Sequence, residues 1–431
     1  MRMKTTLRRT GLVFVLLGAA MVGAALLLAD RLGGPTVVST ASGAPADVQM
    51  QPAAGGADQA DALQAAIDGL QAGQRLVLSP GVYVVGRVLA MRGEQVVMSG
   101  YGATLVATNP DQQAIMMTGK NSTLVGVTLN GIGTERLESA TSAKVAVDGD
   151  GIQVLDVTIN GGASAGIFVS RGSSIALVGN KVSGTLADGI HITGSSHDVL
   201  VQDCSVTATG DDMVGIVSYQ RDGAVTQNVY VTGNYLAGNA WGRGVAVVGG
   251  ANVTVTGNWI EGVQKAAAVM VAQEDGYRTA DVTNVLIASN SIADDQNATQ
   301  PGNNRAPAGH AAIDLNTGSG SVSQVLVTGN QITRTHFDGF RAQGNICRTG
   351  ITGNRFAAVN GTPVSLQYRN CAADQFICDT NTLDGASLAV PPGCSGAGSI
   401  QVSGADASRL PQVRTSLRRA LNAALPLPRA G

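Results

Sequence analysis

The chain has 431 residues, of which 44% are hydrophobic, 3% aromatic and 13% charged, and its formal net charge is −2. This length permits one large domain or two ordinary ones, and the lack of a basic excess argues against nucleic acid as a partner. The 57 glycines and the many β-branched residues favour short strands joined by tight turns.

The N-terminal residues predict export. The stretch "MRMKTTLRRT" is positively charged, and the run from Gly11 to Ala29 contains no charged residue. That run is longer than the core of an ordinary signal peptide and almost long enough to span a bilayer. Residues 1–31 are therefore predicted to be a signal peptide or an N-terminal membrane anchor, with the rest of the chain outside the cytoplasm: periplasmic, on the cell surface or secreted. Residues 32–57, rich in Pro, Gly, Ala and Ser, indicate a flexible linker.

A helix and then a long series of repeats follow. The segment "ADQADALQAAIDGL", which begins at Ala57, predicts an amphipathic helix that would cover the open end of a sheet. Four copies of one pattern come later: "NVYVTGNYL", "NVTVTGNWI", "NVLIASNSI" and "QVLVTGNQI". Aligned with weaker copies, the repeated position falls at Val127, Val157, Asn180, Cys204, Asn234, Asn258, Asn290, Asn330 and Asn354.

The intervals between these positions have a base period of about 24 residues, and apolar and polar residues alternate within each copy. Together these features predict an all-β fold, a right-handed parallel β-helix. The solenoid is predicted over residues 58–398 with an N-terminal capping helix, and its recurring asparagines should stack from coil to coil. Residues 399–431 are a C-terminal tail or a second capping helix.

Four of the five cysteines lie close together in the C-terminal part: Cys347, Cys371, Cys378 and Cys394. In an oxidising compartment they predict two disulfides, for which three pairings remain open. A zinc site is the weaker alternative, because no CxxC pair or neighbouring His accompanies them. Cys204 stands apart and should be buried and unreactive.

Three aspartates share one position of the repeat. Asp188 follows Asn180 at the same interval at which Asp212 follows Cys204, so the two should stack on successive coils about 4.8 Å apart, with Asp211 beside them. Carboxylates this close cannot all ionise freely, and a pair with separated pKa values is what glycoside hydrolysis needs. The alternative is that these are turn aspartates. Asp338 falls in the same column several coils away and is expected to be structural.

Five further residues are predicted to bind substrate around this column, although each has an ordinary alternative as a surface or packing residue. Arg243 should lie near the aspartate column one coil later, and His191 should point outward beside Asp188. The ring of Trp241 suits stacking on a sugar face. The insertion from Ser218 to Gln227 is placed to form a wall of the substrate groove. The five residues are His191, Tyr219, Trp241, Arg243 and Lys265.

The segments that carry the three aspartates resemble those of a known family. The region from Asp58 to Asn354 looks like the pectin-lyase-like superfamily of β-helices, and "ADGIHI" with "GDDMVGI" resembles the polygalacturonases, the family 28 glycoside hydrolases. That family carries Asn-Thr-Asp, Asp-Asp, Gly-His-Gly and Arg-Ile-Lys motifs. Here the first keeps only its Asp, as Leu186-Ala187-Asp188, the doublet is intact, Arg243 replaces the His of the third, and the fourth is missing.

The resemblance implies that Asp211 is the general acid and that Asp188 and Asp212 activate water in an inverting hydrolysis. We therefore expect an exported glycoside hydrolase that acts on a polysaccharide, a monomer without cofactor or metal, tethered to the membrane if the N-terminal segment is retained. A polysaccharide lyase or epimerase, with Arg243 or Lys265 as the base, is an alternative, as is a non-catalytic glycan-binding or adhesive solenoid. Arg243 is one cation near the site, and Lys265 is the only cation in the coil that should hold the fourth motif, where Glu274 would repel a uronate. A neutral or weakly charged glycan is therefore predicted in preference to polygalacturonate.

Overall fold

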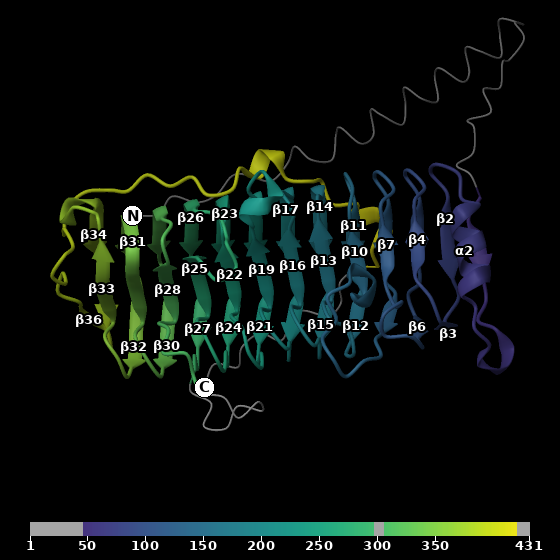
Figure 1. Ribbon diagram of the computed structural model, residues 1–431, viewed down its shortest axis with the longest axis horizontal. Helices are drawn as coiled ribbons and strands as arrows, with labels where there is room; N and C mark the ends of the chain where they lie inside the picture. The colour runs from purple at the N-terminus through teal and green to yellow at the C-terminus, as the bar shows by residue number, and fades with distance from the viewer. Residues whose placement is uncertain (1–45, 297–305, 420–431) are drawn as a thin grey trace, which may run out of the picture. The chain divides into compact units, whose positions relative to one another are not determined.

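The computed structural model describes residues 46–296 and 306–419, which coil into a long stack of parallel strands (Figure 1). The predicted signal peptide or anchor, residues 1–31, and most of the predicted linker lie outside the described residues. Within the described ranges, no helix is both long and hydrophobic enough to cross a bilayer.

Three sheets run along the stack, and each complete coil adds one strand to each sheet. Sheet A contains β1 (Val48–Met50), β2 (Arg75–Leu78), β5 (Val97–Ser99), β8 (Thr123–Val125), β11 (Gln153–Leu155), β14 (Ser173–Val178), β17 (His197–Gln202), β20 (Gln227–Thr232), β23 (Gly250–Thr256), β26 (Val282–Ala288), β29 (Val322–Thr328), β31 (Phe340–Thr352) and β34 (Phe376–Asp379). Sheet B contains β3 (Gly81–Val85), β6 (Ala103–Ala107), β9 (Thr128–Asn130), β12 (Thr158–Asn160), β15 (Lys181–Ser183), β18 (Ser205–Thr207), β21 (Tyr235–Ala237), β24 (Trp259–Glu261), β27 (Ser291–Ala293), β30 (Gln331–Thr335), β32 (Arg355–Val359), β35 (Thr382–Leu383) and β36 (Ala386–Ser387). Sheet C contains β4 (Leu89–Met91), β7 (Ile115–Met117), β10 (Val145–Val147), β13 (Ile167–Ser170), β16 (Ile190–Thr193), β19 (Val214–Val217), β22 (Val245–Val248), β25 (Val269–Gln273), β28 (Ile313–Thr317), the first part of β31, and β33 (Val364–Arg369).

The core is built from columns of apolar side chains that point inward and stack in register. In sheet C the column Ile190, Val214, Val245 and Val269 is fully buried and paired from strand to strand. Because side chains alternate between the two faces of a strand, the next residue of each strand points outward. This alternation confirms the predicted parallel β-helix, and it leaves the outer face of sheet C available for a site.

A ladder of buried asparagines stabilises the turn between sheets A and B. From Asn234 onward, each side-chain amide donates to the Oδ1 of the asparagine on the next coil at 2.9–3.0 Å, and the column continues through Asn258, Asn290, Asn330, Asn354 and Asn381. Each Nδ2 also donates to a backbone carbonyl, so these buried groups are satisfied. The predicted stacking is confirmed, and it extends one coil further, to Asn381. Cys204 takes the place of an asparagine in the column and is buried with a free thiol.

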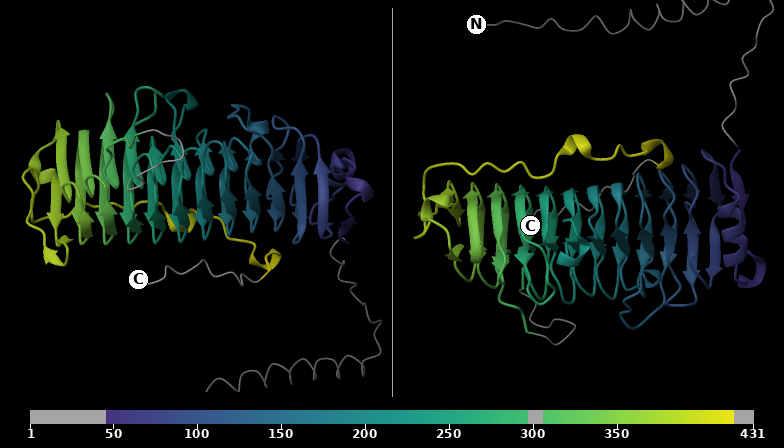
Figure 2. Two further views of the ribbon diagram at one scale, coloured as in Figure 1. Left: turned by 90° about the horizontal axis from the view of Figure 1, so that it is seen from below. Right: turned by 45° about the horizontal axis from the view of Figure 1, so that its top comes forward.

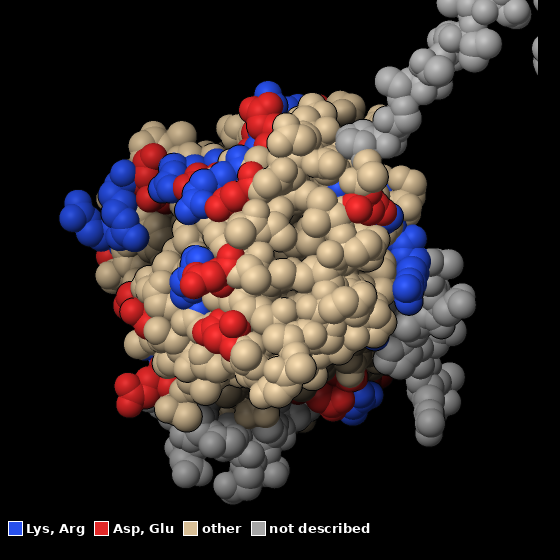
Figure 3. Space-filling model, turned by 90° about the vertical axis from the view of Figure 1, so that its right-hand side faces the viewer, with Lys and Arg blue, Asp and Glu red and all other residues tan. Residues whose placement is uncertain are grey.

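One helix, α2 (Ala60–Asp68), covers the N-terminal end of the stack, as predicted. The Gln64 side chain accepts a hydrogen bond from Ala90 N at 2.8 Å and donates to Ala90 O at 3.0 Å, so it pairs with the otherwise open edge of β4. Figure 3 looks at this end of the stack, where acidic and basic side chains lie side by side on a largely uncharged face. Part of the predicted linker, residues 32–57, belongs to the solenoid. Its residues Val48–Met50 form strand β1, which pairs in parallel with β2.

The C-terminal strap, residues 399–419, runs back along the outer face of sheet A, as the yellow segment in Figures 1 and 2 shows. It is extended, with two short 3₁₀ turns, and forms no α-helix over this described part. Its side chains Leu410 and Val413 pack on an apolar patch of sheet A made by Val125, Leu155, Ala176, Val178 and Leu200. Ion pairs tie it down, with Arg409 at 3.0 Å from Asp198 and Arg418 at 2.7 Å from Asp156.

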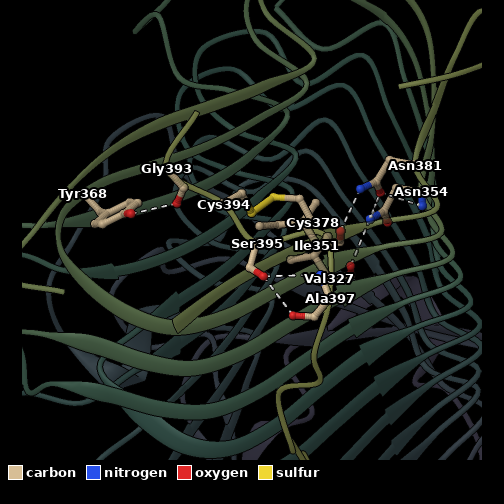
Figure 4. Close-up of a disulfide and its surroundings, with 10 residues drawn as sticks. All are labelled: Val327, Ile351, Asn354, Tyr368, Cys378, Asn381, Gly393, Cys394, Ser395 and Ala397. Carbon is tan, nitrogen blue, oxygen red and sulfur yellow. Dashed lines mark hydrogen bonds between the residues drawn. A yellow bond between two sulfur atoms is a disulfide. The ribbon is translucent and has the colours of Figure 1, made fainter. Parts of the chain in front are cut away.

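Two disulfides close the C-terminal end of the solenoid. They join Cys347 to Cys371 and Cys378 to Cys394, which confirms two bridges and selects one of the three open pairings. Figure 4 shows the Cys378–Cys394 bridge beside the last asparagines of the ladder.

We expect peptide mapping without reduction to recover Cys347–Cys371 and Cys378–Cys394 peptides, and alkylation of the unfolded, unreduced protein to label Cys204 alone. The reason is that Cys204 is buried, and burial raises the pKa of its thiol to about 12, which keeps it out of disulfide exchange. Four alkylatable C-terminal thiols in protein taken from its native compartment would contradict this arrangement.

Candidate active site

The aspartates lie in one column at the start of successive sheet C strands. Register places Asp188 before β16, Asp212 before β19 and Arg243 before β22 at the same position. The Asp188 Oδ1 accepts a hydrogen bond from Asp212 N at 3.2 Å, and the Asp212 Oδ1 accepts one from Arg243 N at 2.7 Å. Asp338 accepts a hydrogen bond from Thr362 N in the same way at 2.7 Å. Aspartates of this column thus accept a hydrogen bond from a backbone amide of the next coil both inside and outside the site. The site is distinguished by the clustering of three carboxylates.

Each of the three carboxylates has a positively charged or protonatable partner. Asp188 Oδ2 lies 2.5 Å from His191 Nδ1, and His191 stacks on Phe168 on the preceding coil. Asp211 Oδ2 accepts a hydrogen bond from the Arg136 guanidinium at 2.7 Å, and Asp212 Oδ1 lies 3.1 Å from Arg243 Nε. The Arg243 guanidinium also reaches Glu274, at 3.5 Å.

The three carboxylates form one electrostatically coupled set. One oxygen from each of Asp188, Asp211 and Asp212 lies within 4.8 Å of the others, and among the described residues this is the one cluster of three or more acidic, His or Cys side chains close enough to hold a metal ion. Oxygen ligands of this kind suit a hard divalent cation. Without a cation, mutual repulsion favours a bound proton.

Burial decides where that proton rests. Burial is the main cause that raises the pKa of Asp212 to about 8; the Arg243 guanidinium lowers it, whereas the charges of Asp188 and Asp211 raise it further. Burial lowers the pKa of His191, but its hydrogen bond to Asp188 and the charge of that carboxylate outweigh burial, so the pKa is raised overall. At neutral pH the free protein therefore keeps a proton on Asp212.

The column opens onto a cavity of about 720 Å³ on the outer face of sheet C. Three long turns form its walls, and they carry Arg136 and Glu138, then Tyr219 and Arg221, then Glu274, Tyr277 and Arg278. A second hollow of about 320 Å³ adjoins it and shares residues such as Arg136, Asp188 and His191. The carboxylates thus lie in a groove that continues along the solenoid on the side of the preceding coils.

The structure brings together most of the predicted site residues. Asp188, His191, Asp211, Asp212, Tyr219, Trp241 and Arg243 all line the larger cavity. Lys265 does not appear in its wall: its Nζ lies 4.9 Å from the centre of the Trp241 ring and donates to the backbone carbonyl of Ala306. Lys265 therefore contacts a residue of the cavity wall, Trp241, without lining the cavity itself.

Several wall residues were missed from the sequence. Arg136, Glu138, Tyr277 and Arg278 come from the long turns, outside the repeated pattern. The only signal was the length of these turns, for example the extended step between Val127 and Val157. The cavity also has more cations than the sequence indicated, since Arg136, Arg221 and Arg278 reach it in addition to Arg243.

Comparison with known proteins agrees with this architecture. A family model described as "Right handed beta helix region" matches residues 113–275 and 165–356, more than half of the chain. The chain therefore belongs to the right-handed β-helix family, as the resemblance to the pectin-lyase-like superfamily predicted. No curated protein matches it in sequence.

Solved structures from several carbohydrate-active families share the fold. The catalytic unit of a GH87 α-1,3-glucanase from Streptomyces thermodiastaticus is 16% identical with a TM-score of 0.56, covering 80% of this chain and 70% of its own. A family 28 exopolygalacturonase from Yersinia enterocolitica is 12% identical with a TM-score of 0.54, covering 75% and 79%. The A-module of the mannuronan C-5 epimerase AlgE6 from Azotobacter vinelandii is 17% identical with a TM-score of 0.53, covering 78% and 96%. These likenesses establish the fold, and the chemistry has to be argued from the site.

Proposed function

We propose that this protein is an exported glycoside hydrolase that cleaves a polysaccharide in the groove of sheet C. The observation that carries the proposal is the cluster of Asp188, Asp211 and Asp212 in an open groove, in which burial raises the pKa of Asp212 to about 8. Hydrolysis of a glycosidic bond needs one carboxylic acid and one carboxylate together, and a turn needs no such cluster.

The exposure of the three side chains suggests their roles. Asp211 is the most exposed, at 19% against 9% for Asp188 and 7% for Asp212, so it is best placed to reach the leaving oxygen as general acid. One of its oxygens lies within 4.8 Å of an Asp212 oxygen. Asp188, paired with His191, then accepts a proton from the attacking water.

Lyase or epimerase chemistry has less support from these side chains. Burial opposes the charge of Arg243, but the Asp212 and Glu274 carboxylates raise its pKa further above the usual range, so it is a poor base. Lys265 contacts the Trp241 ring and the Ala306 carbonyl and is not among the residues that line the cavity. Neither residue is therefore placed to abstract a proton from a sugar ring.

The charges in the groove favour a neutral or weakly charged glycan. The cavity wall carries four arginines, Arg136, Arg221, Arg243 and Arg278, against five acidic residues, Asp188, Asp211, Asp212, Glu138 and Glu274. Two of these arginines are paired with Asp211 and Asp212. A polyuronate would need a surplus of free cations, typically arginines in bidentate geometry. The α-1,3-glucanase among the structural neighbours acts on a glucan, which makes neutral glucans the first substrates to try.

The test is product analysis on a panel of α-1,3-glucan, other neutral glucans, polygalacturonate and alginate at low salt, where charge attraction is strongest. We expect new reducing ends from a neutral glucan, no unsaturated product, and little cleavage of polygalacturonate. An unsaturated product indicates a lyase, and binding without new ends indicates an adhesive solenoid; either result contradicts the proposal. Efficient cleavage of polygalacturonate would contradict the substrate class alone.

Export is proposed on chemical grounds. The two disulfides are stable in oxidising compartments such as the periplasm or the cell exterior. The charged N-terminal stretch and the apolar run after it are the sequence signal for that route, with or without a retained membrane tether.

We expect hydrolysis to decline as the pH rises through about 8, because the carboxylate set then loses its shared proton from Asp212. Arg243→Gln should move this decline to higher pH, since it removes the cation that lowers the pKa of Asp212. The measurement is kcat/KM against pH, with Arg278→Gln as the control from the same cavity wall. A decline that stays in place or moves to lower pH in Arg243→Gln would show that Asp212 does not hold the proton.

A further inference from the structure

An ion pair crosses the outer face of sheet C one coil beyond the aspartates. Arg243 precedes β22 and Glu274 follows β25, so the two residues come from opposite ends of neighbouring strands. Arg243 Nη2 nevertheless lies 3.5 Å from Glu274 Oε1, while Arg243 Nε lies 3.1 Å from Asp212 Oδ1. The pair therefore lies across the groove, between the aspartate side and the opposite wall.

The outer face of sheet C is covered from this pair onward. The outward side chains of β22 and β25 are 0–3% exposed and belong to one buried cluster: Ala246, Val248, Met270 and Ala272. On β28 the outward Asp314 is fully buried and lies 2.7 Å from Arg341. Arg341 also donates to Gly309 O at 3.1 Å, so the segment that precedes β28 contacts this pair. The open groove therefore does not continue over these strands.

The side of the preceding coils is different. Phe168 and His191 are partly exposed there and line the hollow of about 320 Å³ that adjoins the site. A separate hollow of about 250 Å³, with Met270 and Asn316 in its wall, lies beyond the ion pair. Among the described residues, Glu274 alone lines both this hollow and the cavity of the site. Glu274 is thus the partition between the two spaces.

We propose that the Arg243–Glu274 pair closes the groove, so that the protein cleaves a polysaccharide from a chain end, as an exo-acting enzyme. The inference rests on the proposed hydrolase function. The chain would enter over the preceding coils, and its terminal sugars would lie between the aspartates and the ion pair. Neighbouring strands are about 4.8 Å apart, so the single coil step from Asp212 to Arg243 leaves room for a short terminal piece only. Each cleavage adds one water across the bond and releases a mono- or disaccharide.

The first test follows the products that the wild type forms from α-1,3-glucan and the other linear neutral glucans of the panel. Each cleavage creates one reducing end wherever it falls, whereas the average chain length shows where the bonds break. We expect reducing ends to appear with little early loss of chain length, and one small sugar to dominate from the first time point. An early mixture of many product lengths, with a rapid fall in chain length, would overturn the inference and leave the hydrolase function standing.

The second test removes the partition. Glu274→Ala should connect the cavity to the hollow beyond it, so longer products should appear and chain length should fall faster for the same number of reducing ends. Glu138→Ala is the matched control, because Glu138 is a glutamate of the same cavity that lines the adjoining hollow on the open side. Its product pattern should stay that of the wild type. A single small product from Glu274→Ala, with an unchanged melting temperature, would show that the pair does not close the groove.

The third test does not depend on turnover. Linear neutral glucan oligosaccharides with a bulky fluorescent group at one end or the other are titrated into Asp211→Asn, which lacks the proposed general acid. A label at one end should abolish binding and a label at the other should be tolerated, because only one end reaches the ion pair. Equal binding of the two labelled forms would overturn the inference.

The outcomes separate the two proposals. A wild type that cleaves no glycan contradicts the hydrolase function, and the two labelled forms then still decide whether the groove is closed. A protein that neither cleaves nor binds any of these glycans contradicts both proposals.

Discussion

Replacing either Asp211 or Asp212 with asparagine is expected to reduce turnover by about a hundredfold or more and to leave the fold intact. Asparagine has nearly the same shape but cannot exchange a proton, and loss of a general acid or base has an effect of this size. Asn at position 212 can still accept the hydrogen bond from Arg243 N. The measurement is the rate of reducing-end release, together with the melting temperature of each variant.

Stability should change in a direction set by the pKa of Asp212. Its pKa in the folded protein, about 8, lies above that of an unfolded Asp, so the stability linked to its protonation is present at low pH and is lost as the pH rises towards 8. Asp212→Asn removes this loss and should match or exceed the wild type in melting temperature at pH 7–8. Asp338→Asn is the control, because it changes the same column several coils away. Wild-type activity in Asp212→Asn, or an equal loss in Asp338→Asn, would remove the case for catalysis at this cluster.

Asn258→Ala is expected to destabilise the solenoid by roughly 2–4 kcal/mol, since each buried polar group left without a partner costs about 1–3 kcal/mol. The Asn258 side chain accepts hydrogen bonds from the backbone and side-chain amides of Asn234 at 3.0 and 2.9 Å. It donates to Val231 O at 3.0 Å and to Asn290 Oδ1 at 2.9 Å. Removing it therefore interrupts the ladder in both directions. The shift of the denaturant midpoint measures the effect.

The matched control is Asn160→Ala. Asn160 is exposed on sheet B, and its side chain donates a hydrogen bond to Asn130 Oδ1 at 3.0 Å, so its loss should cost well under 1 kcal/mol. If the two variants unfold at the same denaturant concentration, the asparagine ladder adds no measurable stability, and the stacked apolar columns stabilise the coils without it.

The repeated part of the molecule could be predicted because it follows a periodic rule. The alternation of inward and outward side chains gave the parallel β-helix, and the spacing after Asn180 and Cys204 placed Asp188 on Asp212. Such a register follows from the repeat without any knowledge of distant contacts.

The walls of the site could not be predicted in the same way. Arg136 reaches Asp211 from a turn 75 residues earlier in the chain, and turns of irregular length have no periodicity from which to infer where a side chain ends. The protonation state of Asp212 could not be predicted from the sequence either, because it depends on how deeply the side chain is buried and on the charge of Arg243. The disulfide pairing also needed the three-dimensional positions of the coils.

The C-terminal strap has a consequence for how the chain folds. Contacts between coils join residues close in sequence, so coils can form one after another as the chain emerges, as in other solenoids. The strap instead joins residues 119 to 318 positions apart, from Ser403 with Asn284 to Arg419 with Tyr101.

Docking of the strap must therefore come last, after every coil beneath it has formed. Until then the apolar patch around Leu155, Val178 and Leu200 faces water. The chain is therefore most prone to aggregate after the last coil has formed and before the strap docks. A chaperone that shields sheet A would act in this interval.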